Sequence, residues 1–162
     1  MTDTFTPVEG HCTCGKVRYR MARRPLFIHA CHCTWCQRET GTAFALNALI
    51  ESEEVTLVAG TPESILTPSN SGKGQHIVRC PDCRVAVWSH YAGAGFGLMF
   101  VRVGTLEHPE SFAPDIHIFT STKLPWVVLP DGVPAVPEYY KSSETWPAES
   151  LARRTRLFAK PN

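Results

Sequence analysis

Cys12-Thr13-Cys14 and Cys80-Pro81-Asp82-Cys83 are two short cysteine pairs, and sixty-five residues separate them. A third stretch, Cys31-His32-Cys33-Thr34-Trp35-Cys36, holds the other three of the seven cysteines. Two cysteine pairs of this kind can form tight turns that together complete one tetrahedral zinc site. The sequence therefore predicts a closed, structural zinc site that joins the start of the chain to its middle. Its expected ligands are Cys12, Cys14, Cys80 and Cys83.

The central stretch offers three thiolates within six residues, which leaves one position of a tetrahedral metal open. Structural zinc sites are closed by four protein ligands, whereas catalytic sites have three and keep an open position. We therefore expect a second, catalytic zinc on Cys31, Cys33 and Cys36, and these cysteines are the predicted catalytic residues. The alternative is a closed site that His32, His29 or another nearby side chain completes.

Three thiolate ligands also decide which chemistry suits the metal. They more than neutralise the charge of Zn²⁺, which makes the ion a weak activator of water. Soft thiolate sites favour a further sulfur ligand. A free thiol has a pKa of about 8.5, and coordination to zinc deprotonates it. The open position is therefore better suited to delivering a substrate thiolate than to hydrolysis.

The start of the chain, MTDTFTPVEGHC, lacks the basic residues and the apolar stretch of a signal peptide. We therefore expect a reducing cytoplasm, where clustered cysteines more often bind metals or catalyse reactions than form disulfides. Cys80 and Cys83 could instead be a thioredoxin-like redox pair, but such a pair opens a helix. Residues 84–90 have the pattern of a strand, which disfavours the redox interpretation.

Length and composition are those of a globular protein. At 162 residues the chain can bury a sizeable core, and we expect a single domain over residues 1–162. The formal net charge is only +1, without a long run of like charge, so no nucleic-acid partner is expected. No apolar run is long enough to span a bilayer, and no membrane partner is expected.

Short β-like stretches separated by glycine and proline predict a mainly β fold. The expected strands lie at residues 16–21, 26–29, 44–50, 54–58, 64–66, 76–79, 85–91, 96–103, 117–119 and 126–129. Helices are expected at Thr34–Thr40, ending at Gly41, and at the end of the chain from Pro147 onward. The Pro-rich segment between Pro130 and Pro147 is expected to wrap the surface.

These motifs closely resemble the glutathione-dependent formaldehyde-activating enzyme family, which also includes centromere protein V. The resemblance rests on residues 10–19 (GHCTCGKVRY), residues 31–38 (CHCTWCQR) with Gly41, and residues 79–83 (RCPDC). Residues 117–120 (HIFT) with Trp126 look like the closing motif of the family. The resemblance covers a zinc-binding core from about residue 9 to about residue 130, which leaves residues 131–162 as a C-terminal extension.

The resemblance implies a β-tent fold, in which antiparallel sheets surround zinc. It also implies the same division of the cysteines into four structural and three active-site ligands. The enzyme that names the family adds glutathione to formaldehyde to give S-hydroxymethylglutathione, a carbon–sulfur lyase activity. We therefore expect a cytoplasmic zinc enzyme similar to S-(hydroxymethyl)glutathione synthase, with a small thiol and a small aldehyde as substrates. The resemblance also allows a homodimer.

Two further questions stay open at the level of sequence. Glutathione carries two carboxylates, and a solvated surface charge is the alternative role for each cation that could bind them. These cations are Arg38, Lys73, Arg79, Arg102 and Lys123. Two functions without catalysis also compete: a two-zinc binding module, as the relation to centromere protein V allows, and a redox sensor with a labile, oxidisable zinc.

Overall fold

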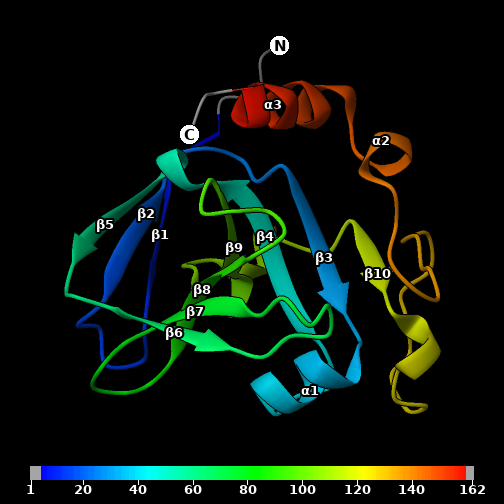
Figure 1. Ribbon diagram of the computed structural model, residues 1–162, viewed down its shortest axis with the longest axis horizontal. Helices are drawn as coiled ribbons and strands as arrows, with labels where there is room; N and C mark the ends of the chain where they lie inside the picture. Colours follow the sequence, from blue (N-terminus) through cyan, green and yellow to red (C-terminus); the bar gives the residue numbers. More distant parts are fainter. Residues whose placement is uncertain (1–4, 160–162) are drawn as a thin grey trace.

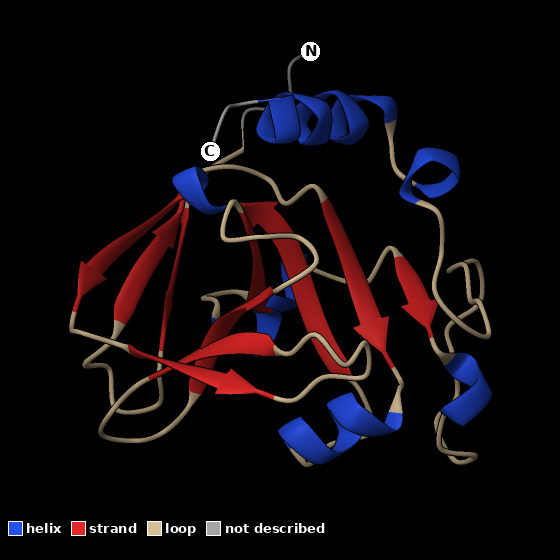
Figure 2. Ribbon diagram, in the orientation of Figure 1, coloured by secondary structure: helices blue, strands red, loops and turns tan. Residues whose placement is uncertain are grey.

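The computed structural model describes residues 5–159 and consists mainly of β-strands in two sheets (Figure 1, Figure 2). The larger sheet contains, in spatial order, β10 (Ile116–Ile118), β3 (Phe27–Cys31), β4 (Ala45–Glu51), β9 (Leu98–Arg102), β8 (Ala86–Tyr91), β7 (Gln75–Arg79) and β6 (Glu63–Thr67). The smaller sheet contains β1 (Val8–His11), β2 (Arg18–Met21) and β5 (Val55–Ala59). Neighbouring strands run antiparallel except β10 and β3, which run parallel. The expected mainly β fold with antiparallel sheets is confirmed.

Both faces of the central strands of the larger sheet are covered, and this explains why these strands lack alternation of polar and apolar residues, whereas the edge strand β6 is exposed. Every residue of β3 and of β9 is buried. On one face the sheet packs against the smaller sheet, where the rings of Tyr19 and Trp88 meet edge to face at 5.3 Å. On the other face lies a second apolar cluster to which the end of the chain contributes Tyr140 and Trp146. Phe27 stacks on Trp146 there, with ring centroids 5.7 Å apart.

The helices lie at opposite ends of the sheets (Figure 1). α1 (Thr34–Thr40) follows β3 and ends at Gly41, whose positive φ of 68° suits glycine, as the sequence predicts. α3 (Ala148–Ala159) is the expected terminal helix. A short α2 (Ser142–Thr145) precedes it, and single turns of 3₁₀-helix occur at Ser52–Glu54, Val103–Thr105, Pro109–Ser111 and Thr120–Thr122. No helix within residues 5–159 is long and apolar enough to cross a membrane.

Two strand predictions differ from the structure. Residues 126–129 form no strand. The segment is held in a turn, because Nζ of Lys123 donates hydrogen bonds to the carbonyls of Leu124 and Val127. β1 was not predicted, because its sequence, VEGH, has little apolar character. It is held through its pairing with β2 and through Glu9, which accepts hydrogen bonds from Arg18 and Arg20.

The segment between Pro130 and Pro147 does more than wrap the surface. Most of its residues are exposed, as expected, but Ala135 forms a parallel bridge with His117 at the edge of the larger sheet. Tyr140 and Trp146 are buried, and the indole N–H of Trp146 donates a hydrogen bond to the Tyr140 hydroxyl at 3.0 Å. This segment therefore completes the second apolar cluster.

A buried ion pair fastens α3 to the larger sheet. Arg153 donates two hydrogen bonds to the carboxylate of Glu51, from Nε to Oε1 at 2.9 Å and from Nη2 to Oε2 at 2.6 Å. Its Nη1 donates to the backbone carbonyl of Arg24 at 2.8 Å. Burial by itself would raise the pKa of Glu51, but the Arg153 guanidinium outweighs it and holds this pKa below its ordinary value. Glu51 is therefore ionised at neutral pH.

Replacing Arg153 with methionine should lower the free energy of unfolding by about 3–5 kcal/mol, because it leaves the Glu51 carboxylate buried and unpaired. Arg156 lies exposed on the same helix, so Arg156→Met should change the stability by no more than about 0.5 kcal/mol. Denaturant-induced unfolding of both variants measures the difference. Equal effects of the two substitutions would show that the ion pair does not hold the helix.

Candidate metal centres

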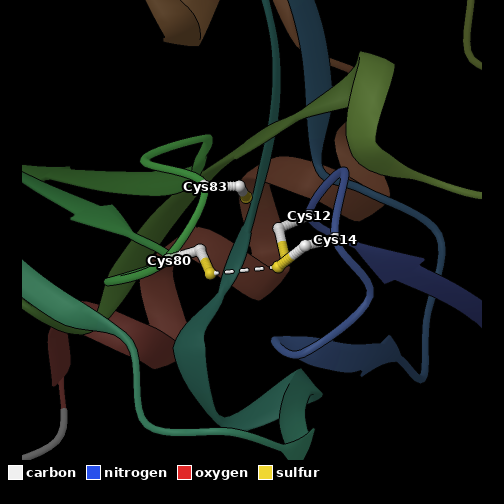
Figure 3. A group of neighbouring side chains, drawn as sticks. All are labelled: Cys12, Cys14, Cys80 and Cys83. Carbon is white, nitrogen blue, oxygen red and sulfur yellow. Dashed lines mark hydrogen bonds between the residues drawn. The ribbon is translucent and has the colours of Figure 1, made fainter.

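The first candidate centre lies where two loops meet. Cys12 and Cys14 follow β1, and Cys80 and Cys83 lie between β7 and β8, with the two loops facing each other (Figure 3). All four sulfurs lie within 4.8 Å of one another. The Sγ atoms of Cys12 and Cys14 are 3.5 Å apart, and those of Cys14 and Cys80 are 3.6 Å apart. Zn–S bonds of about 2.3 Å in a tetrahedron place sulfurs about 3.8 Å apart, so this arrangement fits a zinc ion.

The two loops share a backbone design. The N–H of Cys12 donates to the carbonyl of Val17 at 3.1 Å, and the N–H of Cys80 donates to the carbonyl of Val85 at 3.0 Å. In both loops the hydrogen bond thus joins residues i and i+5. Each loop turns through a residue with positive φ, Gly15 at 75° and Arg84 at 63°. In the first loop the N–H of Val17 also donates to the Cys12 sulfur at 3.4 Å. These turns bring both cysteines of each pair to one side.

The ion pair between the two loops holds them together only weakly. Lys16 and Asp82 form an ion pair across them at 2.6 Å, but 64% and 47% of their side chains are exposed. Exposed pairs of this kind contribute about 0–1 kcal/mol. The backbone N–H groups of Val85 and Cys14 lower the pKa of Cys83 to about 6, which favours the thiolate that a metal requires. A metal ion would therefore supply most of the attraction between the loops.

Loss of one ligand from this centre should unfold the protein. Structural zinc contributes on the order of 10–16 kcal/mol in small peptides, which matches the whole stability of a typical domain, about 5–15 kcal/mol. We expect Cys83→Ser to reduce the metal content and to abolish cooperative thermal unfolding, as followed by circular dichroism. Thr13→Ser, in the facing loop, is the control and should retain both properties. A cooperatively folded Cys83→Ser protein without metal would contradict a structural role.

The second candidate centre is built where β3 passes into α1. Cys31 is the last residue of β3, Cys33 is the N-cap of α1, and Cys36 lies one helical turn further on. Their sulfurs lie within 4.8 Å of one another, and all three residues are buried. The Cys33 sulfur accepts a hydrogen bond from the N–H of Cys36 at 3.3 Å, which caps the helix. Both predicted groups of cysteines are thus brought together by the fold.

The charge of the second group also fits a cation. Hydrogen bonds from Cys31 and Cys36 lower the pKa of Cys33, and the bond to Cys33 in turn raises the pKa of Cys31. These opposite shifts follow from how closely the sulfurs approach one another. Three neighbouring thiolates require a cation to neutralise them, and a bound metal ion would do so.

No histidine joins this group of sulfurs. Among the residues that the structure describes, no histidine nitrogen or carboxylate oxygen lies within 4.8 Å of all three cysteine sulfurs. The His32 ring turns away, and its Nε2 is 2.9 Å from Nδ1 of His117. The His29 ring packs against Phe100 and Tyr140. The geometry thus gives no support to closure of the site by His32 or His29.

The pair of His32 and His117 is a feature that the sequence analysis missed. Both rings are buried, and Phe44 packs against His32 with ring centroids 5.0 Å apart. Within residues 5–159, His32 Nδ1 and His117 Nε2 have no hydrogen-bond partner. Whichever ring donates to the other, one buried N–H group and one buried lone pair are left unpaired. The sequence places His117 in the closing motif, but only the parallel pairing of β10 with β3 brings it to His32.

Two of the predicted cations lie together beside α1. Arg79 and Arg102 both form ion pairs with Glu39, a residue of α1. Arg102 is further fixed by a 2.6 Å hydrogen bond from its Nη1 to Oδ1 of Asn47. Arg79, Arg102 and Glu39 line a cavity of about 330 Å³, together with Thr40 and other residues. Two guanidinium groups against one carboxylate leave this cavity with an excess positive charge.

The other three predicted cations do not line this cavity. Arg38 and Lys73 are exposed. The ammonium group of Lys123 donates hydrogen bonds to two nearby backbone carbonyls, so it already has partners within its own loop.

The hydrogen bond with Cys31 lowers the pKa of Cys36, but the bond with Cys33 and burial outweigh it, so this pKa is raised. The charge of nearby Arg102 is a smaller influence that acts to lower it. Arg102 therefore lies near the second centre, whereas Arg79 is linked to it only through Glu39, and none of the three cysteines lines the cavity.

The chain belongs to the glutathione-dependent formaldehyde-activating enzyme family. The sequence pattern of this family matches residues 7–122, compared with the expected span from about residue 9 to about residue 130. A solved structure of a Rhodobacter sphaeroides protein from the Northeast Structural Genomics programme is similar to this chain. The two have 20% sequence identity and a TM-score of 0.47, and the match covers 62% of this chain and 88% of the other.

Proposed function

We propose that this protein is a zinc enzyme of the carbon–sulfur lyase type, similar to S-(hydroxymethyl)glutathione synthase. It joins a small thiol, glutathione or a similar compound, to formaldehyde or another small aldehyde. The observation that carries this proposal is the buried group of three cysteines, which no His, Asp or Glu of residues 5–159 joins, in a member of this family. Cys31, Cys33 and Cys36 hold the catalytic zinc. The other four cysteines hold a structural zinc.

Zinc held by Cys31, Cys33 and Cys36 would supply a Lewis acid that favours the thiolate form of a substrate thiol. The three cysteine side chains supply enough negative charge to make water a poor competitor with that thiol. The substrate sulfur then attacks the carbonyl carbon of the aldehyde. A carbon–sulfur bond forms, the electron pair of the C=O bond moves to oxygen, and oxygen takes up a proton from solvent. No oxidant or reductant is needed.

The neighbouring residues exclude water and orient the substrate. Cys31, Cys33 and Cys36 are all buried, within the apolar cluster that includes Phe100 and Ile118. A thiol that binds there can extend its remaining groups toward the cavity beside α1, where Arg79 and Arg102 carry positive charge. A guanidinium group recognises a carboxylate through paired hydrogen bonds. Arg79 is the more exposed of the two arginines and is the better candidate to meet a substrate carboxylate.

Cobalt substitution tests the catalytic centre directly. We expect two metal ions per chain, and we expect glutathione to change the visible absorption of the cobalt ion on the three-cysteine group. Cys36→Ser should remove this response and lower the rate of S-hydroxymethylglutathione formation by more than about 100-fold. Its cost in folding stability should be about 1 kcal/mol, since the four-cysteine site remains. A folded wild-type protein whose cobalt spectrum responds to no thiol would favour a two-zinc binding module over an enzyme.

The role of Arg79 can be separated from that of the metal. Arg79→Gln should raise the KM for glutathione about tenfold, which corresponds to about 1.4 kcal/mol of lost binding free energy. The KM for 2-mercaptoethanol, which has no carboxylate, should not change. Arg38→Gln, on the exposed side of α1, is the matched control and should leave both constants unchanged. Equal losses with both thiols in Arg79→Gln would indicate a structural effect on α1.

A further inference from the structure

A second cavity, outside both cysteine groups, is lined by two histidines. His76 on β7 and His90 on β8 are directly opposite each other in the antiparallel register. Residues in such positions project from the same face of a sheet, with Cβ atoms about 4.5–5.5 Å apart. Both line a cavity of about 180 Å³, together with Tyr91, Gly95 and Phe96. Both imidazole rings therefore border one space.

Each imidazole is engaged at Nδ1. His90 Nδ1 is 2.9 Å from the backbone carbonyl of Leu98. A carbonyl oxygen only accepts hydrogen bonds, so Nδ1 of neutral His90 carries the hydrogen and Nε2 presents a lone pair. His76 Nδ1 lies 3.5 Å from the hydroxyl of Ser64. No hydrogen bond engages Nε2 of either histidine in the part of the chain that the structure describes.

For His90 this pattern is the one that histidines bound to metals show. A metal-ligating histidine almost always uses its second ring nitrogen to donate a hydrogen bond, which fixes the ring and the tautomer. Burial lowers the pKa of His90, and nearby His76 acts in the same direction, so His90 is neutral at pH 7. A neutral imidazole is the form that ligates a metal.

Phe96 holds the two rings in place from the loop between β8 and β9. Its ring centroid lies 5.0 Å from that of His76 and 5.2 Å from that of His90. The remaining space is sufficient for an ion and several water molecules, because one water occupies about 30 Å³ in the liquid. Water can therefore complete the coordination that two histidines begin.

We propose that His76 and His90 form a two-histidine site for a divalent transition-metal ion, with both Nε2 atoms as ligands and water in the other positions. Imidazole ligands suit Zn²⁺, Cu²⁺ and Ni²⁺. The site shares no residue with either cysteine group, so it stands independently of the proposed enzymatic function. It gives the protein a third metal position, held by nitrogen in place of sulfur.

Zinc titration with NMR detection tests this site. Protein whose cysteine groups are saturated with zinc is titrated with further Zn²⁺, and the imidazole ¹⁵N resonances are recorded. We expect one additional equivalent to bind and the Nε2 resonances of His76 and His90 to shift together. Both His76→Gln and His90→Gln should weaken the binding of this equivalent by at least about tenfold. His108→Gln, at an exposed position, is the control and should not change it.

Two outcomes would overturn the proposal. One is additional zinc that binds without shifts at His76 and His90, and the other is binding that persists unchanged in His76→Gln. His76 is only half-buried, so this variant keeps the test valid if His90→Gln fails to fold. The assigned Nε2 resonances report on this site alone, so the result does not depend on whether the three-cysteine group binds a thiol.

Discussion

The contact between the loop at Cys12–Val17 and the loop at Cys80–Val85 is the constraint on which the rest of the structure depends. The first loop belongs to the smaller sheet and the second to the larger one. Joining them sets the two sheets face to face, and the core between them, with Tyr19 against Trp88, forms as a consequence. The direct protein contacts across the loops include an exposed ion pair and contacts of Cys14 with Cys80 and Cys83, so four sulfurs around a metal would be the stronger link.

The three-cysteine group depends on this arrangement indirectly. β3 is buried on both faces, because the smaller sheet covers one and the end of the chain covers the other. Its last residue, Cys31, therefore enters a protected environment. Glu39 then ties α1 to β7 and β9 through Arg79 and Arg102, which holds the helix that carries Cys36 against the sheet. The centre is thus positioned by rigid elements, as a reactive site requires.

The two kinds of cysteine group could be predicted from sequence because ligand spacing is a local property. Two cysteines one or two residues apart already define a turn, and Cys33 and Cys36 already define one turn of a helix. The strands of the larger sheet were also predictable, since runs such as Phe96–Val103 are apolar enough to indicate full burial. β1 could not be predicted in the same way, because it is stabilised by pairing and by the ion pairs of Glu9.

The features that the sequence did not reveal all depend on contacts between distant residues. His32 and His117 meet through the parallel pairing of β10 with β3, and Tyr140 reaches the core only because the final segment folds back over the larger sheet. His76 and His90 likewise become neighbours only in the register of β7 and β8. Cysteine ligands can thus be recognised from local sequence motifs, whereas histidines on separate strands cannot. A sequence search for metal sites in a β-protein therefore finds thiolate sites first and misses those that strand register assembles.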